Sequence, residues 1–193
     1  MSLHKDDLRS KKIVFVANCL LNANNKVLEA ARYKGMFSDV IKILDELGFG
    51  IIQMPCPETL YMGNQRWYNS RNLYDNVGYR RLCRELASPM ADYMENYIKI
   101  GYESVGILTC DGSPSCGITK SSYCEDWGGK PKAVERILVD KPGIFMEELL
   151  NVLSERGIKC PPIYGLAMDD HDKSTEEILN DFKEYAEKEW AGY

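Results

Sequence analysis

The chain has 193 residues, of which 45% are hydrophobic and 27% charged, and its formal net charge is -5. These values predict one globular domain, 1–193, with a flexible N-terminal stretch, 1–10. Its hydrophobic core should be large enough to be stable without disulfides or bound metals. No apolar run approaches the length of a membrane span, and the negative charge argues against DNA as a partner.

The cell compartment of the protein decides whether its seven cysteines can form disulfides. The first residues, MSLHKDDLRSKK, are polar and charged and do not resemble a secretory signal, so we expect a cytoplasmic protein without a membrane partner. Structural disulfides are rare in the cytoplasm. The cysteines are therefore expected to be metal ligands, nucleophiles or small core residues.

The first half of the chain predicts strand, helix, strand and helix in succession. Residues 13–17 form an apolar, β-branched run that is typical of a buried parallel strand. Residues 37–48 have apolar residues at helical spacing, with Ser38 as the expected N-cap. A second strand lies within 49–58 and is stopped by two prolines. Residues 76–100 are helical again, and we expect the proline near their centre to break or bend the helix.

The second half repeats this alternation. Strands are predicted at 104–110 and 161–167, and helices at 143–157 and 174–190, the last opening with a Ser-x-x-Glu capping box. Residues 117–142 show no clear period and indicate a long loop, of the kind that often forms a lid. The alternation predicts an α/β protein, a three-layer α/β/α sandwich around a Rossmann-like open parallel sheet of about four strands.

Cysteines follow each of the first three predicted strands. Cys19 follows the first strand, Cys56 the second, and Cys110 and Cys116 lie at and after the end of the third. Ligands bind outside the carboxyl ends of the strands in open α/β sheets, so at least three thiols should meet at one edge if neighbouring strands pair. The roles of Cys110 and Cys124 stay open. The other two cysteines, Cys83 and Cys160, are expected to be ordinary structural residues.

Three motifs resemble one known family, the 2-thiouracil desulfidases. They are CLL after the first strand, CPE after the second and SPSCG after the third. In that family three cysteines hold a [4Fe–4S] cluster, and the fourth iron is left free for the sulfur of the substrate. The resemblance implies that Cys19, Cys56 and Cys116 are the cluster ligands. It also implies that Glu58 and Ser113 form the catalytic pair.

The implied reaction is a hydrolysis without net redox change. Water replaces the sulfur of a thiocarbonyl group, and sulfide is released. An open iron is a Lewis acid and accepts sulfur, while a carboxylate two residues from a ligand can move a proton. The expected substrate is a small thiolated heterocycle such as thiouracil. A thiolated nucleoside or tRNA base is an alternative, although the acidic chain gives tRNA no general support.

The chain also departs from the family pattern, and the departures concern substrate recognition. Arg66 is followed by Trp67 and further aromatic residues, which could stack on a heterocycle or simply pack a surface loop. Asp111 and Ser115 flank the catalytic serine in the third motif. We expect these four side chains to bind substrate. Together with the long loop, the departures favour a substrate other than free thiouracil.

Two other kinds of function agree with the same cysteines. One is a metal-free enzyme that uses a cysteine nucleophile or transfers sulfur. The other is a protein without catalysis that carries a cluster or metal, or binds a small ligand. Metal analysis separates the first from the desulfidase, and an assay for released sulfide separates the second.

Overall fold

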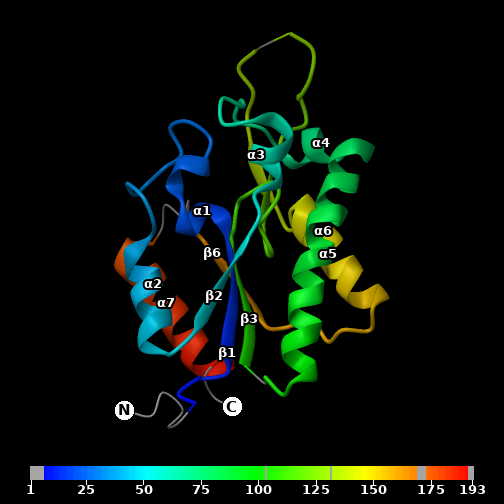
Figure 1. Cartoon of the computed structure of the whole chain (residues 1–193). Helices are drawn as coiled ribbons and strands as arrows, with labels where there is room; N and C mark the ends of the chain where they lie inside the picture. The colour runs from blue at the N-terminus through cyan, green and yellow to red at the C-terminus, as the bar shows by residue number, and fades with distance from the viewer. Residues whose placement is uncertain (1–6, 103, 131, 169–172, 191–193) are drawn as a thin grey trace.

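A computed structural model gives the fold, and the residues it describes are 7–102, 104–130, 132–168 and 173–190. Its centre is a parallel sheet in the order β2–β1–β3–β6, with helices on both faces (Figure 1). The strands are β1 (Lys12–Ala17), β2 (Gly50–Met54), β3 (Ser104–Cys110) and β6 (Ile163–Leu166). The predicted α/β fold with a four-stranded parallel sheet is confirmed.

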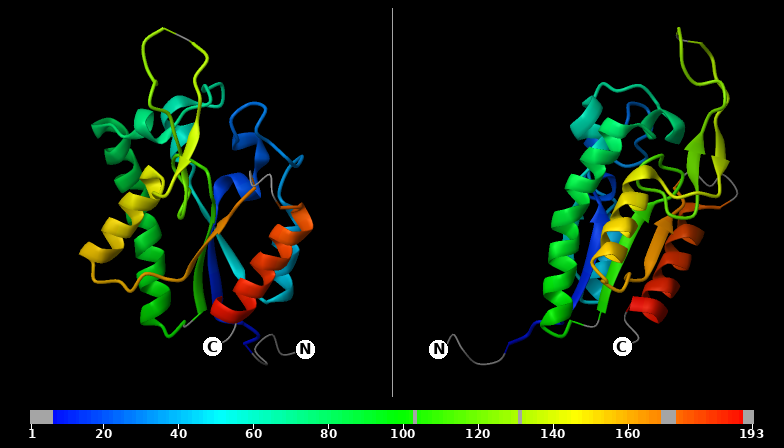
Figure 2. Two further views of the ribbon diagram at one scale, coloured as in Figure 1. Left: turned by 180° about the vertical axis from the view of Figure 1, so that it is seen from behind. Right: turned by 90° about the vertical axis from the view of Figure 1, so that its right-hand side faces the viewer.

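The helices form the two outer layers. Helices α2 and α7 cover one face of the sheet, and α5 and α6 cover the other (Figure 2). None of the helices in the described part of the chain is long and apolar enough to cross a membrane. The bounds are α1 (Asn18–Leu21), η1 (Ala23–Asn25), α2 (Ser38–Glu46), α3 (Pro57–Met62), α4 (Arg71–Tyr74), α5 (Val77–Lys99), α6 (Ile144–Glu155), α7 (Thr175–Tyr185) and the π-helical η2 (Ala186–Trp190).

The central strands are buried because they are apolar on both faces. Val14, Phe15 and Val16 of β1 have no exposed surface, and β1 pairs in parallel with β2 on one side and β3 on the other. Trp190 closes the core at the end of the last helical segment. Its indole lies so close to Gly106 in β3 that a Cβ there would come within 2.6 Å of the ring.

One of the two predicted helix N-caps is confirmed, and the other is wrong. The capping box of α7 is confirmed, since the Ser174 hydroxyl accepts from the Glu177 backbone and the Glu177 carboxylate accepts in return. The predicted N-cap Ser38 is wrong. Ser38 is the first residue of α2, and its neighbour Phe37 occupies the cap position without a side-chain hydrogen bond.

Pro89 and Pro57 both lie inside helices, so the predicted break at Pro89 is wrong. Helix α5 runs through Pro89 without a break, because the residues around it are buried on one face and pack against α6. Pro57 does more than end a strand. It occupies the first turn of α3, where a missing backbone N–H costs nothing. Strand β2 therefore ends at Met54, and a short helix begins almost at once.

The predicted long loop contains a hairpin that the sequence did not reveal. Strands β4 (Ser121–Tyr123) and β5 (Ile137–Val139) pair antiparallel, and the segment between them rises above the carboxyl end of the main sheet (Figure 2). Three residues are too few to show an alternating pattern. At the other end of the molecule, residues 1–6 of the expected flexible N-terminus lie outside the described residues.

Candidate functional site

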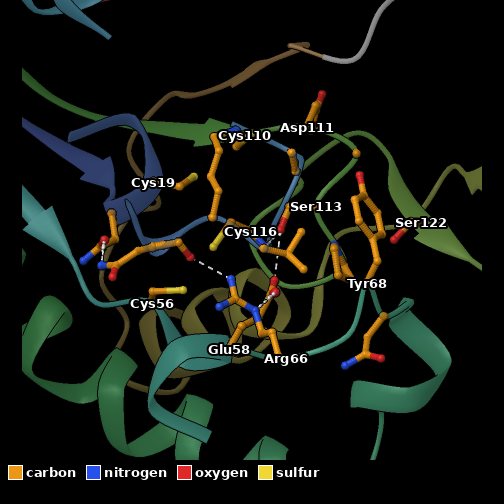
Figure 3. A pocket seen from close by; sticks show the side chains of 18 residues that line it. Cys19, Cys56, Glu58, Arg66, Tyr68, Cys110, Asp111, Ser113, Cys116 and Ser122 are labelled. Atoms are coloured by element: carbon orange, nitrogen blue, oxygen red, sulfur yellow. Dashed lines mark hydrogen bonds and ion pairs between the residues drawn. The ribbon is translucent and has the colours of Figure 1, made fainter. Parts of the chain in front are cut away.

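A cavity of about 90 Å³ lies at the carboxyl end of the sheet and collects the cysteines that follow the strands. Its lining includes Cys19, Cys56, Cys110 and Cys116, together with Glu58 (Figure 3). These residues come from three separate segments of the chain. The sheet order puts β1 between β2 and β3, so the three segments emerge side by side. The predicted meeting of thiols at this edge is present.

The first two cysteines are held by their own local structure. Cys19 lies in α1, directly after β1, and its carbonyl oxygen accepts from the Tyr33 hydroxyl at 2.7 Å. Cys56 is the N-cap residue of α3, between two prolines that fix the chain direction. The Thr59 hydroxyl donates to the Cys56 sulfur at 3.4 Å. Both sulfurs therefore face the cavity from short, anchored turns (Figure 3).

The third segment is anchored to the beginning of α6. The backbone N–H groups of Ile144 and Phe145 donate to the carbonyl oxygens of Pro114 and Ser115, each at 3.0 Å. These bonds satisfy N–H groups that a helix start otherwise leaves unpaired. The helix thus holds the SPSC turn, and with it Cys116, in one position.

Gly143 is the point at which this anchoring is most easily broken. A Cβ at residue 143 would overlap the backbone of Ser115 and Cys116, which cannot rotate away as a side chain can. The backbone of Gly143, with φ -69° and ψ 159°, suits any residue, so Gly143→Ala tests crowding alone. We expect this variant to lose about 1–3 kcal/mol of unfolding free energy in a denaturant titration.

Gly35→Ala is the matched control, because nothing lies within 4 Å of its Cβ position. It should unfold at nearly the same denaturant concentration as the wild-type chain. Equal stability of the two variants would show that the turn and α6 are not tightly packed together.

The thiols of the cavity influence one another. A hydrogen bond with Cys110 and then burial raise the pKa of Cys19 well above its usual value. Burial and the nearby Cys56 and Glu58 do the same to the pKa of Cys116. Both groups are therefore protonated thiols at neutral pH when no metal is bound. A metal that binds them has to displace their protons.

Glu58 is held in place by partners on several sides. Its Oε2 atom lies 3.1 Å from Arg66 Nε, in a pair whose side chains are 14% and 3% exposed. The Tyr74 hydroxyl lies 3.4 Å from the same oxygen, and Ser113 Oγ lies 3.5 Å from Oε1. Arg66 also donates to the carbonyl oxygen of Asn25 at 2.7 Å, so it joins two walls of the cavity.

Ser113 has a structural contact as well as a place beside Glu58. Its Oγ accepts from the backbone N–H of Cys116 at 3.0 Å and from that of Ser115 at 3.3 Å. Both contacts use oxygen lone pairs, so the O–H hydrogen stays available for Glu58 or for a ligand. The predicted catalytic pair thus lies together in the cavity.

The four residues predicted to bind substrate lie in different places. Arg66 and Asp111 line the cavity, but the Asp111 carboxylate is engaged by Thr119 and by the backbone N–H of Ile118 at 2.7 Å. Ser115 is fully buried and bonds to the Tyr79 hydroxyl at 2.6 Å instead of facing the cavity. Trp67 is 77% exposed and lies at a different, larger opening.

That larger opening is a second cavity of about 400 Å³ beside the first. Tyr68 and Asn69 line both cavities, so the two adjoin there. The guanidinium of Arg136 lies 3.5 Å from the centre of the Tyr68 ring. Among the described residues that line it, the charged ones are all basic: Lys130, Lys132 and Arg136.

Several residues that line the first cavity were not predicted from the sequence, and the role of Cys110 was left open. Cys110 lines it, but residues at a strand end face the core or the site depending on a register that sequence does not fix. Asn69 and Ser122 line it through segments that no motif marked. Cys83, Cys124 and Cys160 lie elsewhere, in the core, beside Asn72 and at the surface respectively.

The cysteines are the residues that could hold a metal centre. Among the described residues, no group of three or more His, Cys, Asp or Glu side chains converges closely enough for a single metal ion. A cubane cluster places a different requirement, because its irons occupy separate corners and its thiolate ligands stand around it. The thiols of Cys19, Cys56 and Cys116, which come from three segments around one cavity, are the residues that could hold such a cluster.

Comparison with known proteins gives one informative match. No protein-family model matches the chain, and no solved structure matches it. The chain is 35% identical to the uncharacterized protein MJ0003 of Methanocaldococcus jannaschii over 114 residues. The aligned part covers 59% of this chain and 72% of that protein. At this identity and coverage the two share a fold and an origin, and the chain belongs to the family of MJ0003.

Proposed function

We propose that the protein is an iron–sulfur-dependent desulfidase that removes sulfur from a thiolated heterocycle, such as thiouracil, by hydrolysis. The observation that carries the proposal is one cavity that holds the thiols of Cys19, Cys56 and Cys116 beside the paired carboxylate of Glu58. The three motifs that resemble the thiouracil desulfidases supply these four residues.

The donor set suits a [4Fe–4S] cluster with three protein ligands, Cys19, Cys56 and Cys116. Thiolates are the usual protein ligands of such clusters. When bound, a cluster with one iron free of protein ligands would supply a Lewis acid that accepts the sulfur of a thiocarbonyl group. Cys110 lies against Cys19 and is left outside this ligand set.

The protein groups beside the thiols provide for the proton transfers. Hydrolysis adds water to the thiocarbonyl carbon, breaks the carbon–sulfur bond and leaves a carbonyl group and sulfide. Water has to lose both of its protons: one goes to the departing sulfur, which leaves as hydrosulfide, and the other is released to solvent. Glu58 can accept and return the first of these protons, because Arg66 and Tyr74 bind one carboxylate oxygen and leave the other toward Ser113. Ser113 can hold the substrate or the departing sulfide.

The metal-free alternative is disfavoured by the state of the thiols. The nucleophile in cysteine chemistry is the thiolate. The raised pKa values of Cys19 and Cys116 keep both residues protonated near neutral pH. A bound metal removes this obstacle, since it stabilises the thiolate directly.

The second cavity supports a substrate larger than the free base. A ring that reaches the thiols can extend past Tyr68 into the opening formed by Trp67 and Trp127. Three cations favour a negatively charged substituent there. We therefore infer that a thiolated nucleoside monophosphate is a better substrate than thiouracil itself. This inference agrees with the departures of residues 59–76 and 117–142 from the desulfidase pattern.

Sulfide release after anaerobic iron–sulfur reconstitution tests the proposal. We expect the reconstituted protein to release sulfide from 2-thiouracil or 4-thiouridine, and to release it faster from 4-thiouridine 5′-monophosphate. Sulfide is measured with a colorimetric assay, and the desulfurised base by chromatography. The protein without iron is the control and should release none.

Two outcomes contradict the proposal. Sulfide release by the iron-free protein points to cysteine chemistry without a cluster. A cluster that forms without turnover of any thiolated base points to a carrier function.

A further inference from the structure

The hydroxyl of Ser122 is buried at the cavity wall without a partner. Ser122 lies in β4, and its residue surface is 8% exposed. Its Oγ atom has no hydrogen-bond partner among the described residues, and the residue lines the cavity that holds the cysteines. Buried hydroxyl groups in folded proteins are nearly always hydrogen-bonded, so this exception requires an explanation.

The backbone leaves this side chain little freedom to find a partner elsewhere. The Ser122 N–H donates to the carbonyl oxygen of Gly112 at 3.0 Å, and the residue pairs with Leu138 across the hairpin. The strand is therefore fixed on two sides. Side chains alternate along a strand, so Ser121 and Ser122 point to opposite faces, and only Ser122 reaches the cavity.

The position of Ser122 in the cavity suggests what its partner is. Figure 3 shows Ser122 on the opposite side of the cavity from Cys19 and Cys56, beyond Tyr68. A molecule held by its sulfur near the thiols would present its far edge to this hydroxyl. A serine hydroxyl both donates and accepts, so it suits the N–H and C=O groups of a pyrimidine edge.

We propose that Ser122 binds the substrate, through a hydrogen bond from its hydroxyl to the polar ring edge opposite the sulfur. The inference rests on the proposed function for the class of ligand, a thiolated pyrimidine. It adds a recognition residue from the hairpin, which carries none of the three cysteine motifs. The hairpin then takes part in the site rather than merely covering it.

Ser122→Ala separates this role from a structural one. The substitution removes a hydroxyl that has no hydrogen-bond partner among the residues the structure describes, so the variant should be as stable as the wild-type chain or more stable. Substrate binding should weaken, with KM raised about 3- to 10-fold for the loss of one neutral hydrogen bond. The kcat should stay unchanged, because the bond exists before and during the reaction.

Ser121→Ala is the matched control from the neighbouring position. Ser121 is also fully buried and without a hydrogen-bond partner for its hydroxyl in the described structure, but it does not line the cavity. Its removal should leave both KM and stability unchanged or raise stability slightly. A difference in KM between the two alanine variants, at equal stability, is the result that supports the proposal.

Binding is also measured without turnover, by calorimetry with 2-thiouracil and with uracil. Weaker binding by Ser122→Ala alone supports the inference. It does so even when no sulfide is released, a result that would contradict the proposed reaction but not the role of Ser122 in binding. Equal binding by wild type and Ser122→Ala overturns the inference and leaves an internal water as the partner of the hydroxyl. An equal loss in both alanine variants also overturns it. Absence of binding to wild type overturns the ligand class.

Discussion

Replacing Cys19, Cys56 or Cys116 with serine is expected to abolish iron binding. Serine keeps the size of the side chain but removes the soft, easily deprotonated sulfur that iron–sulfur clusters require. Wild-type protein reconstituted without oxygen should be brown and contain about four irons per chain. Each serine variant should be colourless, with iron measured by elemental analysis and folding checked by circular dichroism.

The remaining cysteines supply the controls for this experiment. Cys160→Ser at the surface and Cys83→Ala in the core should keep the full iron content. Cys110→Ala is the most informative variant, because Cys110 lines the same cavity. We expect it to keep the iron. Loss of iron in Cys110→Ala would give the cluster four protein ligands and no open iron, and the proposed reaction would fail.

Glu58→Gln is expected to keep the cluster and still bind substrate, but to release little sulfide. Glutamine preserves the shape of the side chain and the bonds to Arg66, while it removes the carboxylate that accepts a proton. General acid–base groups contribute about 10²- to 10⁴-fold to rates, so kcat should fall by that much. Single-turnover sulfide release and iron content are measured on the same preparation.

The substitution also leaves the buried charge of Arg66 without its counter-charge, so a loss of stability has to be told apart from a loss of catalysis. Glu147→Gln serves this purpose. Glu147 pairs with Arg71 and Arg80 outside the cavity, and its removal costs stability without touching the site. We expect Glu147→Gln to turn over normally. Normal turnover by Glu58→Gln would show that Glu58 is a structural partner of Arg66 and not a catalytic residue.

The sequence was sufficient for the parts of the fold that depend on local pattern. The buried apolar residues Val14, Phe15 and Val16 of β1, and Ile107 and Leu108 of β3, follow one another without alternation, which is typical of strands covered on both faces. Once the sheet was parallel, the strand ends had to share one edge, and the meeting of Cys19, Cys56 and Cys116 followed. Their connection to one cavity also required β1 to lie between β2 and β3, which the order of elements along the chain does not fix.

The parts that could not be predicted depend on long-range contacts. The bond between Tyr79 and Ser115, which keeps Ser115 away from the cavity, joins residues in distant elements. Asp111 is engaged by the turn that follows it, a conformation that the letters DGSPS do not specify. Whether the Ser122 hydroxyl has a partner among the described residues is visible only once its neighbours in the fold are placed. None of these features has a period or a motif.

In the proposed function, substrate recognition by the hairpin of β4 and β5 is separate from the reaction at the cysteines. The two strands of the hairpin pair mainly with each other. Of the helices in the described structure, β4 packs mainly against α4, so the hairpin has few contacts with the parallel sheet. Insertions or substitutions at its tip would therefore leave the cysteine cavity intact. Descendants of one ancestral gene could acquire different substrates by changing this segment alone, while the residues that carry the chemistry stayed the same.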